Sequence, residues 1–336
     1  MKAVIPLAGR GTRLYPQTHT KPKAMIRIAG KPILGHILSS LAETEIEEVV
    51  LVVGGPMQTQ IREYATDKFG DEFDFSFPEQ SDPLGLGHAI YQARSAVDGE
   101  PILIALGDML FERGYQSFID AHEAQETTDG SIGTKRVGEP RHYGVVDVTE
   151  EGTVAELVEK PDDPPSDLAI SGAYVIEDSE SLFDALAHHI DNDIRGAGDE
   201  FQLTDALQQM VVEGASLRTF PVEDWYDCGR PETLLEANQV LLESMSPSRS
   251  DTHDEAVFIP PVDVGDGATI RHSIVGPNVS VDEDATIENS LIRNAIVGRD
   301  ASLTEVNLEH SIIGDAATIS GEAHSLNVGD NSDLTL

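Results

Sequence analysis

The sequence predicts an α/β protein in which a mixed, mainly parallel sheet is followed by a short parallel β-helix. Up to about residue 243, short β-rich runs alternate with helical patterns. This order is typical of a mainly parallel sheet that is covered by helices on both faces. After residue 256, short apolar strands recur at a nearly constant spacing, which indicates a solenoid. We therefore expect a first domain over 1–243, a polar linker over 244–256 and a β-helix domain over 257–336.

The first domain contains seven strand-like runs and five helical patterns. The strands are expected at Lys2–Leu7, Glu48–Val53, Phe73–Phe77, Ile102–Leu106, Gly144–Val148, Ile170–Ile176 and Ser216–Val222. The helices are expected at Pro32–Leu41, Leu86–Val97, Ser179–Ile190, Phe201–Val212 and Pro231–Leu242. In the first helix the apolar residues share one face and Pro32 occupies the first turn. Ligands of such a sheet bind beyond the carboxyl ends of its strands.

A triplet of the form Ala-Thr-Ile recurs through the C-terminal region. It occurs as Ala268-Thr269-Ile270, Ala285-Thr286-Ile287, Ala301-Ser302-Leu303 and Ala317-Thr318-Ile319, at spacings of 17, 16 and 16 residues. A second series is superimposed on it: Ser273-Ile274-Val275, Ser290-Leu291-Ile292 and Ser311-Ile312-Ile313. Short strands separated by Gly or Asp turns, three per repeat, indicate a parallel β-helix built from hexapeptides. About four coils fit, and so short a solenoid is expected to pack on the first domain or on a partner subunit.

The charge of the chain is strongly negative and unevenly distributed. It has 60 Asp and Glu against 22 Lys and Arg, a net charge of −38. Its first 42 residues nevertheless contain no acid, although about seven would be expected from the average density. They hold seven cations, namely Lys2, Arg10, Arg13, Lys21, Lys23, Arg27 and Lys31. A group near the N-terminus is therefore expected to require positive surroundings in an otherwise acidic chain.

The overall acid excess has two explanations: an acidic surface that avoids nucleic acids, or a cytoplasm of very high salt. We favour the second, because ~1 M salt shortens the Debye length to ~3 Å and screens this repulsion. A nucleic-acid partner is disfavoured, since phosphate backbones require basic faces. Neither a signal peptide nor a membrane-spanning segment is recognisable, and Cys228 is the single cysteine. We expect a soluble, cytoplasmic protein, and the β-helix and low aromatic content favour a homo-oligomer.

A Gly-rich basic turn, Gly9-Arg10-Gly11-Thr12-Arg13, follows the first predicted strand. This arrangement is how α/β proteins hold phosphates: backbone amides line the oxygens, Arg13 can bind two of them, and Lys23 adds a second charge. A nicotinamide dinucleotide is disfavoured, because the third glycine of that motif is missing and no acid appears before Glu43. The alternative, cations that merely decorate a surface loop, conflicts with the missing carboxylates.

The loop from Glu79 to Ala89 is rich in turn formers and leads into a predicted helix. Its Gln80 amide could bind a base edge, and Gly85 would let the backbone approach a planar ring. An ordinary loop before a capped helix is the alternative.

Four charged residues stand at turns or strand ends. Asp108 ends a buried strand and Asp227 lies in a Gly turn before a helix. Two carboxylates from distant segments can hold Mg²⁺, although each could simply cap a turn or a helix. Glu159 and Lys160 follow the strand-like run Thr153–Val158. They would suit a sugar hydroxyl and a sugar phosphate, or form an ordinary surface ion pair.

Together these motifs resemble the signature of sugar-1-phosphate nucleotidylyltransferases. The matching segments, in order, are Val4 to Leu14, Pro22-Lys23, Gly30 to Leu34, Gln80 to Ala89, Leu106-Gly107-Asp108, Tyr143-Gly144-Val145, Glu159-Lys160-Pro161, Ser171 to Tyr174, Glu200 to Asp205 and Trp225 to Asn238. The resemblance covers about residues 1–245. Within the family it is closest to the long, archaeal-type glucose-1-phosphate thymidylyltransferases with a C-terminal left-handed β-helix. It implies a Rossmann-like sheet of the nucleotide-diphospho-sugar transferase type.

The resemblance also implies roles for matching positions. Arg13, Lys23 and Asp108 would be catalytic, and Asp108 and Asp227 would carry Mg²⁺. The nucleotide would be bound by Leu7, Ala8, Gly9, Gly11, Thr12, Arg13, Gln80, Pro83 and Gly85. The sugar phosphate would be bound by Tyr143, Gly144, Glu159, Lys160, Gly172 and Tyr174. Two departures stand out: Met109 replaces a frequent Asn, and Pro6-Leu7 replaces the commoner Leu-Ala, as also in UTP-glucose-1-phosphate uridylyltransferases. The second departure leaves the choice between dTTP and UTP open.

The implied reaction joins glucose-1-phosphate to dTTP, giving dTDP-glucose and pyrophosphate. The sugar-phosphate oxygen would attack the α-phosphorus in line, so catalysis would depend on positioning and neutralisation of charge. Use of UTP, or of another hexose-1-phosphate, is an open alternative. A β-helix that also acts as an acyltransferase would need a base from His272, His310 or His324, but so few coils leave little room for acyl-CoA. A non-catalytic regulatory subunit is disfavoured, because the proposed catalytic and metal-binding residues are all present.

Overall fold

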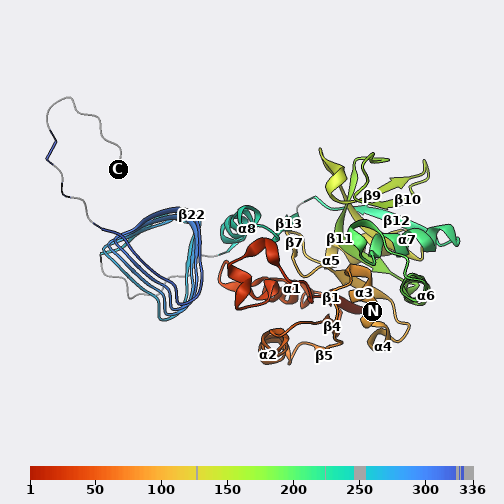
Figure 1. Cartoon of the computed structure of the whole chain (residues 1–336), viewed down its shortest axis with the longest axis horizontal. Coiled ribbons are helices and arrows are strands. Elements are labelled where there is room, and N and C mark those ends of the chain that lie inside the picture. The colour runs from red at the N-terminus through yellow and green to blue at the C-terminus, as the bar shows by residue number, and fades with distance from the viewer. Residues whose placement is uncertain (126–127, 224, 246–254, 323–324, 326, 329–336) are drawn as a thin grey trace. The chain divides into compact units, whose positions relative to one another are not determined.

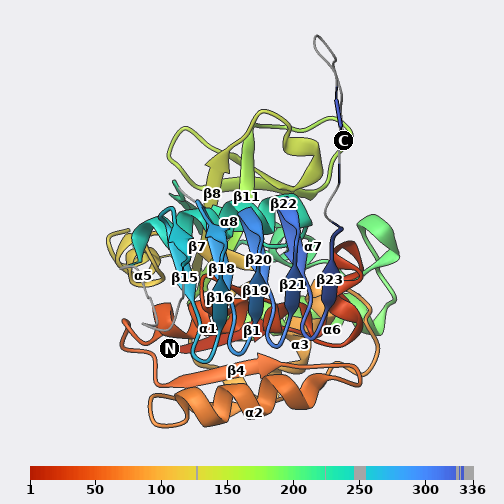
Figure 2. The ribbon, with the colours of Figure 1, turned by 90° about the vertical axis from the view of Figure 1, so that its left-hand side faces the viewer.

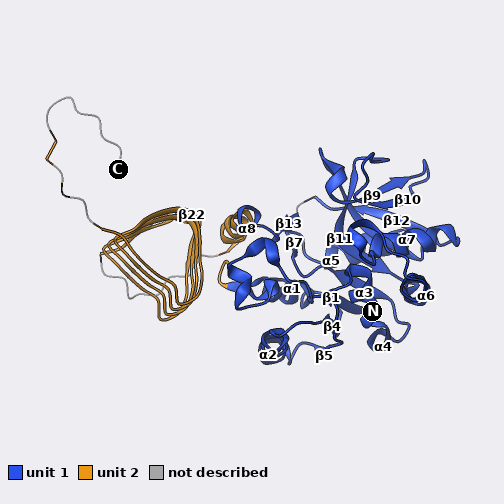
Figure 3. Ribbon diagram, in the orientation of Figure 1, with its two compact units in different colours: residues 1–26, 31–234 blue, residues 27–30, 235–336 orange. Residues whose placement is uncertain are grey.

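The computed structural model describes residues 1–125, 128–223, 225–245, 255–322, 325 and 327–328. They belong to two compact units, one formed by residues 1–26 and 31–234 and the other by residues 27–30 and 235–336 (Figure 3). The division falls inside helix α8, Pro231–Ser244, and it gives four residues near the N-terminus to the second unit. Residues 246–254, the larger part of the predicted linker, lie outside the described residues.

Nine strands of the described chain form the sheet of unit 1, in the order β10-β9-β11-β6-β1-β4-β5, with β8 pairing to β11 and β12 to β8 (Figure 1). They are β1 (Lys2–Pro6), β4 (Glu48–Val52), β5 (Asp74–Ser76), β6 (Ile102–Ala105), β8 (Gly130–Arg136), β9 (Gly144–Val148), β10 (Val154–Glu159), β11 (Leu168–Ile176) and β12 (Leu217–Pro221). Strands β6, β1, β4 and β5 run parallel, whereas β11 is antiparallel to β6, β8 and β9. The predicted mixed α/β sheet is confirmed.

The helices of the described residues are α1 (Ile33–Leu41), α2 (Gln58–Phe69), α3 (Leu86–Gln92), α4 (Arg94–Val97), α5 (Gln116–Glu123), α6 (Ser179–Asp191), α7 (Leu203–Val212) and α8. The five predicted helices are confirmed, although the predicted Leu86–Val97 helix is divided at Ala93 into α3 and α4. Helices α2 and α5 and strand β8 were not predicted. In α2 the buried residues are Ile61 and Ala65, which is too weak an apolar pattern to signal a helix. None of the described helices could span a membrane.

Several short elements complete the described part of the chain before α8. They are the strands β2 (Arg27–Ile28), β3 (Lys31–Pro32), β7 (Met109–Phe111) and β13 (Trp225–Asp227), and the 3-10 helices η1 (Thr12–Leu14), η2 (Gln17–His19), η3 (Lys23–Met25), η4 (Pro140–His142) and η5 (Ala197–Asp199). Of these, residues 27–30 belong to unit 2.

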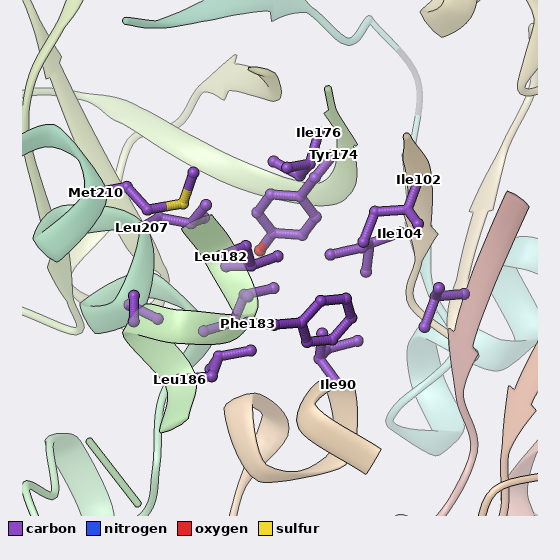
Figure 4. Packing of buried hydrophobic residues seen from close by; sticks show 14 of the residues in the cluster. Ile90, Ile102, Ile104, Tyr174, Ile176, Leu182, Phe183, Leu186, Leu207 and Met210 are labelled. Carbon is purple, nitrogen blue, oxygen red and sulfur yellow. The ribbon is translucent and has the colours of Figure 1, made fainter. Parts of the chain in front are cut away.

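One hydrophobic cluster of unit 1 fills the space between the sheet and helices α3, α6 and α7. Ile102 and Ile104 of β6 and Tyr174 of β11 point toward the apolar faces of these helices (Figure 4). The facing helical residues are Ile90, Leu182, Phe183, Leu186, Leu207 and Met210. Each fully buried apolar side chain of this size contributes about 1.5–3 kcal/mol, so this layer holds the strand ends in place.

In unit 2 the described strands stack in three columns. The coils have a triangular outline in Figure 1, and the strands of successive coils lie side by side in Figure 2. The first column contains β14 (Val257–Phe258), β17 (Ile274–Val275) and the first residues of β20 (Leu291–Val297) and β22 (Asn307–Ile313). The second contains β15 (Val262–Val264), β18 (Val279–Val281) and the last residues of β20 and β22. The third contains β16 (Thr269–Arg271), β19 (Thr286–Glu288), β21 (Ser302–Thr304) and β23 (Thr318–Ser320). The predicted parallel β-helix is confirmed.

The Ala-Thr-Ile repeat corresponds to the third column, where Thr269, Thr286, Ser302 and Thr318 follow one another in register. The second predicted series is only partly right. Ser273 accepts a hydrogen bond from the backbone of Ser290, whose hydroxyl accepts one from Val306. Ser311 instead pairs with Ala295 in the second column. Val306 takes the place that follows Ser290, and Ser311 lies five residues further along, in the next column.

Residues 27–30 are fixed within unit 2 by buried polar contacts. The backbone N–H of Ala29 donates to Asn238 Oδ1 at 2.9 Å and to Ser280 Oγ at 3.1 Å. Arg27 Nε lies 2.8 Å from Asp282 Oδ2, and its other nitrogen donates to the Gly30 carbonyl. Burial raises the pKa of Asp282 above its ordinary value, and the Arg27 charge opposes that rise. Arg27 therefore compensates a carboxylate that is largely buried.

Replacing Arg27 by Met should lower the free energy of unfolding at neutral pH by about 2 kcal/mol, because it leaves the Asp282 carboxylate buried without its partner. Urea denaturation measures this loss. A raised carboxyl pKa means that the folded form binds the proton more tightly, so stability falls as pH rises from 3.8 through the folded pKa. The loss should consequently shrink in acid.

Arg293→Met is the matched control in the same unit, because Arg293 pairs with Glu309 while both side chains are more than a third exposed. Such a surface pair contributes less than about 1 kcal/mol. Equal losses in the two variants would contradict the role given to Arg27.

Candidate active site

A cavity of about 520 Å³ lies in unit 1 beyond the carboxyl ends of β1 and β6. Its walls are formed by Pro6, Leu7, Ala8, Gly9, Arg10, Lys23, Ala24, Gln80, Pro83, Gly85, Leu86, Ala89, Leu106, Gly107, Asp108 and Glu200. Parallel strands place their carboxyl ends at one edge of a sheet, and this edge is where α/β proteins bind ligands. Six of the nine predicted nucleotide-binding residues lie here, namely Leu7, Ala8, Gly9, Gln80, Pro83 and Gly85.

The other three predicted nucleotide-binding residues, Gly11, Thr12 and Arg13, follow in the basic turn. Gly11 has a φ of +60°, and a Cβ on it would lie 3.0 Å from Thr18 and 3.1 Å from Lys23. Any larger residue would therefore strain the turn and press on Lys23. Among the described residues neither Arg10 nor Arg13 has an ion-pair partner, and both side chains are exposed. Arg10, which we did not predict as a site residue, lines the cavity.

Lys23 and the two predicted metal-binding acids come together at one side of the cavity. Lys23 Nζ lies 2.5 Å from Asp108 Oδ2. Strand β13 pairs with β7 so that Asp227 faces Met109, and the Cys228 N–H donates to the Asp108 carbonyl. A Cβ placed on Gly229 would lie 2.6 Å from Asp227 Oδ1 and 3.1 Å from Lys23 Nζ. Two segments more than 100 residues apart thus bring both carboxylates to one ammonium group.

The donor set suits Mg²⁺, which prefers oxygen ligands and usually takes one or two carboxylates together with waters and substrate phosphates. The described residues contain no group of three or more His, Cys, Asp or Glu side chains placed to bind a metal. A site that the protein builds alone, as for zinc, is therefore not present in the described residues. Asp108 and Asp227 are the residues that would hold Mg²⁺, with triphosphate oxygens as the remaining ligands.

The predicted base-binding loop is joined to the segment before α7. The N–H of Gly87 donates to the Phe201 carbonyl, and the N–H of Phe201 donates to the Leu84 carbonyl, each at 2.8 Å. Gly85 has a φ of +116°, and a Cβ there would lie 2.6 Å from the Phe201 carbonyl oxygen. This close approach requires glycine at position 85. Glu200, which we did not predict as a site residue, directly precedes Phe201 and lines the cavity. Its neighbour's contact with the predicted base-binding loop is the feature that could have identified it.

Most of the predicted sugar-phosphate residues also lie together. Glu159 accepts a hydrogen bond from Thr204 Oγ1 at 2.7 Å and lies 3.1 Å from Lys160 Nζ. The Lys160 side chain is half exposed, so its charge is available to a ligand. The Tyr143 ring packs 5.6 Å from the ring of Trp225, two residues before Asp227. This pairing connects the predicted sugar side with the predicted metal side.

Gly144, Gly172 and Tyr174 are the other predicted sugar-phosphate residues. A Cβ on Gly144 would lie 2.9 Å from Glu159 Oε2. The Gly172 carbonyl accepts a hydrogen bond from the N–H of Leu106, which lines the cavity. Tyr174 does not join this group at the surface. It is 3% exposed and lies in the core, and burial raises the pKa of its phenol (Figure 4).

Two of the histidines considered as bases in the β-helix, His272 and His310, lie at tight backbone corners. Their φ values are +47° and +50°: His272 lies in the turn between β16 and β17, and His310 lies at a corner within β22. Asn294, with a φ of +45°, directly precedes Ala295, just as His310 precedes Ser311 in the next coil. His324 lies outside the described residues. Corner positions explain His272 and His310 without any chemistry.

Comparison with known proteins shows the family of the chain. A family model described as nucleotidyl transferase matches residues 2–244. The low-salt glycan biosynthesis nucleotidyltransferase Agl11 of Haloferax volcanii is 33% identical, with all of both chains covered. A glucose-1-phosphate thymidylyltransferase of Streptomyces antibioticus is 30% identical over 100% of this chain and 99% of its own. A solved UDP-glucose pyrophosphorylase in complex with UDP-glucose superimposes with a TM-score of 0.62 at 27% identity, covering 73% of this chain and 99% of its own.

A cationic turn, a cavity at the strand ends and paired carboxylates define an α/β protein that handles phosphorylated ligands. Together with the matches above, they place the molecule among the nucleotidyltransferases. The chain belongs to the sugar-1-phosphate nucleotidyltransferase family.

Proposed function

We propose that this chain transfers a nucleotidyl group from dTTP to glucose-1-phosphate, giving dTDP-glucose and pyrophosphate. The observation that carries the proposal is the Lys23–Asp108 pair at the edge of a cavity lined by Gln80, Gly85 and the glycine-rich turn. The full-length similarity to a protein named glucose-1-phosphate thymidylyltransferase supports it. UTP is the second candidate, favoured by the likeness to a UDP-glucose pyrophosphorylase and by Pro6-Leu7.

The residues of this site would act by binding and neutralising charge. Backbone amides of the turn and Arg13 would bind the triphosphate, while Lys160 and Glu159 would bind the phosphate and a hydroxyl of the sugar. Lys23 would offset the charge that develops on the phosphoryl oxygens as the sugar phosphate attacks in line. Bound Mg²⁺ would supply further charge neutralisation on the leaving pyrophosphate. No side-chain nucleophile is needed, and Cys228, whose pKa burial raises, is not available as one.

The direct test is a panel of hexose-1-phosphates combined with dTTP and UTP, scored by pyrophosphate release. The assay is best run in high salt, because the chain carries a net charge of −38. We expect turnover with glucose-1-phosphate and dTTP at the highest kcat/KM. A higher kcat/KM with UTP would replace the first candidate by the second. Absence of turnover and of binding for every pair would refute both.

Replacing Lys160 by Ala should raise the KM for glucose-1-phosphate about 30-fold while changing dTTP binding less than about twofold. Loss of one charged contact to a phosphate costs about 2 kcal/mol, which corresponds to this factor. Steady-state kinetics measure the first effect and isothermal titration the second. Lys68→Ala, at an exposed position of α2, is the matched control. A larger loss for dTTP than for the sugar phosphate would contradict the assignment.

A further inference from the structure

Gln80 is fixed by two acceptors that leave only its amide oxygen for a ligand. Its side chain is 5% exposed and lines the cavity. Its Nε2 lies 3.1 Å from the carbonyl oxygen of Gly85 and 3.0 Å from Nδ1 of His88. A carbonyl oxygen can only accept, so the atom that faces it must be the amide nitrogen. Both amide hydrogens are then used within the protein, and Oε1 is the atom left to face a base.

His88 can accept this hydrogen bond only as a neutral imidazole whose Nδ1 carries no proton. Burial lowers the pKa of His88 below its ordinary value of 6.5. The carboxylate and the backbone carbonyl of Asp82 act in the opposite direction, but burial is the larger effect. The ring is therefore neutral at neutral pH, as acceptance by Nδ1 requires.

Gln92 competes for the same ring. Its Nε2 lies 3.3 Å from His88 Nε2 and 3.2 Å from the His88 carbonyl oxygen. A neutral imidazole has one acceptor nitrogen, so Gln80 and Gln92 cannot both donate to it. Gln92 is half-buried and has the carbonyl as another acceptor, whereas the second hydrogen of buried Gln80 depends on His88. An unpaired buried N–H costs about 1–3 kcal/mol, so Nδ1 is the acceptor.

We propose that His88 is a positioning residue for base recognition: it holds Gln80 with Oε1 toward the cavity and so selects a base edge that carries an N–H donor. This rests on the proposed function and deepens it. Thymine and uracil carry N–H at N3, whereas the N3 of cytosine is an acceptor. Cytosine would therefore set a lone pair against Oε1, and a buried site rejects such a mismatch strongly. The cavity wall includes Gln80 but not His88, so His88 acts through Gln80.

The test compares His88→Leu, His88→Asn and the control Gln92→Met, with dTTP, UTP and CTP as probes. Leu cannot accept, so Gln80 is free to rotate its amide. In this variant we expect the KM for dTTP to rise about tenfold, kcat to change less than threefold, and the preference for dTTP over CTP to fall about tenfold or more. The oxygen of Asn can occupy the place of Nδ1, so H88N should keep wild-type values. Gln92→Met should also match wild type.

The pH dependence adds a readout that a merely structural role would not change. Protonation turns Nδ1 from an acceptor into a donor, so dTTP affinity of the wild type should weaken as pH falls below 6.5 toward the lower folded pKa. H88N has no titrating group there and should lack this component. Both proteins share the titration of the substrate phosphates, which cancels in the ratio of their KM values.

Two results would overturn the proposal: unchanged rejection of CTP in a folded His88→Leu enzyme, or the same acid-side weakening in H88N as in the wild type. If His88→Leu does not fold, the second comparison still decides. A wild type that turns over no nucleotide with any sugar phosphate would sink the proposed function instead. Isothermal titration of dTTP, UTP and CTP then tests the selection of the base by itself.

Discussion

Replacing Asp108 by Asn is expected to lower kcat about a thousandfold or more while leaving the fold intact. The Asp108 carboxylate lies 2.5 Å from Lys23 Nζ and, together with Asp227, would hold Mg²⁺ at the triphosphate. A thousandfold loss corresponds to about 4 kcal/mol of transition-state stabilisation, a reasonable value for removing a charge that positions a metal. Pyrophosphate release across a range of Mg²⁺ concentrations measures the effect. Asp227→Asn should behave in the same way.

Stability and a matched control separate this effect from unfolding. The Asp108 side chain is 37% exposed, so its replacement should cost little stability, which thermal denaturation checks. Asp184→Asn removes the same charge from an exposed pair with Arg94 and should retain full activity. Near-normal turnover in Asp108→Asn or Asp227→Asn would remove the metal site from the proposed mechanism.

The second large effect is expected from Lys23. Lys23→Met keeps the aliphatic stem but removes the ammonium group that lies against Asp108 and close to Asp227. Two carboxylates would then face the triphosphate without their cation, so kcat should fall about a hundredfold or more, with a smaller change in the KM for dTTP. Single-turnover measurements at saturating substrate isolate this loss from product release.

Lys31→Met provides the control for Lys23, because Lys31 belongs to the same cationic segment but contacts Ser39 on an exposed surface. It should leave kcat unchanged. If the two variants lost equal activity, the effect would come from the total charge of the segment. If Lys23→Met kept wild-type kcat, the ammonium group would have no part in the chemical step.

Local patterns predicted most of the fold. Alternation of apolar runs identified β1, β4 and β6, and the Ala-Thr-Ile repeat identified the coils. The predictions failed where burial comes from tertiary context: β8 begins Gly-Ser-Ile-Gly, without a clear strand pattern, yet it pairs with β11 and β12 in the interior of the sheet. Helix α2 buries only Ile61 and Ala65, so its sequence has no strong apolar face.

Site residues could be predicted where their type and sequence context are seldom found for purely structural reasons. A glycine-rich turn inside an acid-free segment pointed to the phosphate side, and the structure places Gly9 and Lys23 at the cavity. Residues that act through others have no such signal. From the sequence, His88 is only a residue of a predicted helix, and the structure is needed to show that its Nδ1 lies beside Gln80. Tyr174 shows the reverse case: its motif suggested a ligand contact, but the strand on which it lies points it into the core.

The four residues that unit 2 draws from the N-terminal region bear on how this architecture can be rearranged. Ala29 donates to Ser280, and Asp263 lies so close to Gly30 that a Cβ there would come within 2.7 Å of its carboxylate. A gene fragment ending at residue 244 would strip these partners from a segment only four residues beyond Lys23. The β-helix therefore cannot be removed without loss of these contacts. A recombinant that takes its β-helix from a homologue should therefore take the matching 27–30 segment as well. Otherwise the Ala29 N–H and the Arg27 charge lose their partners.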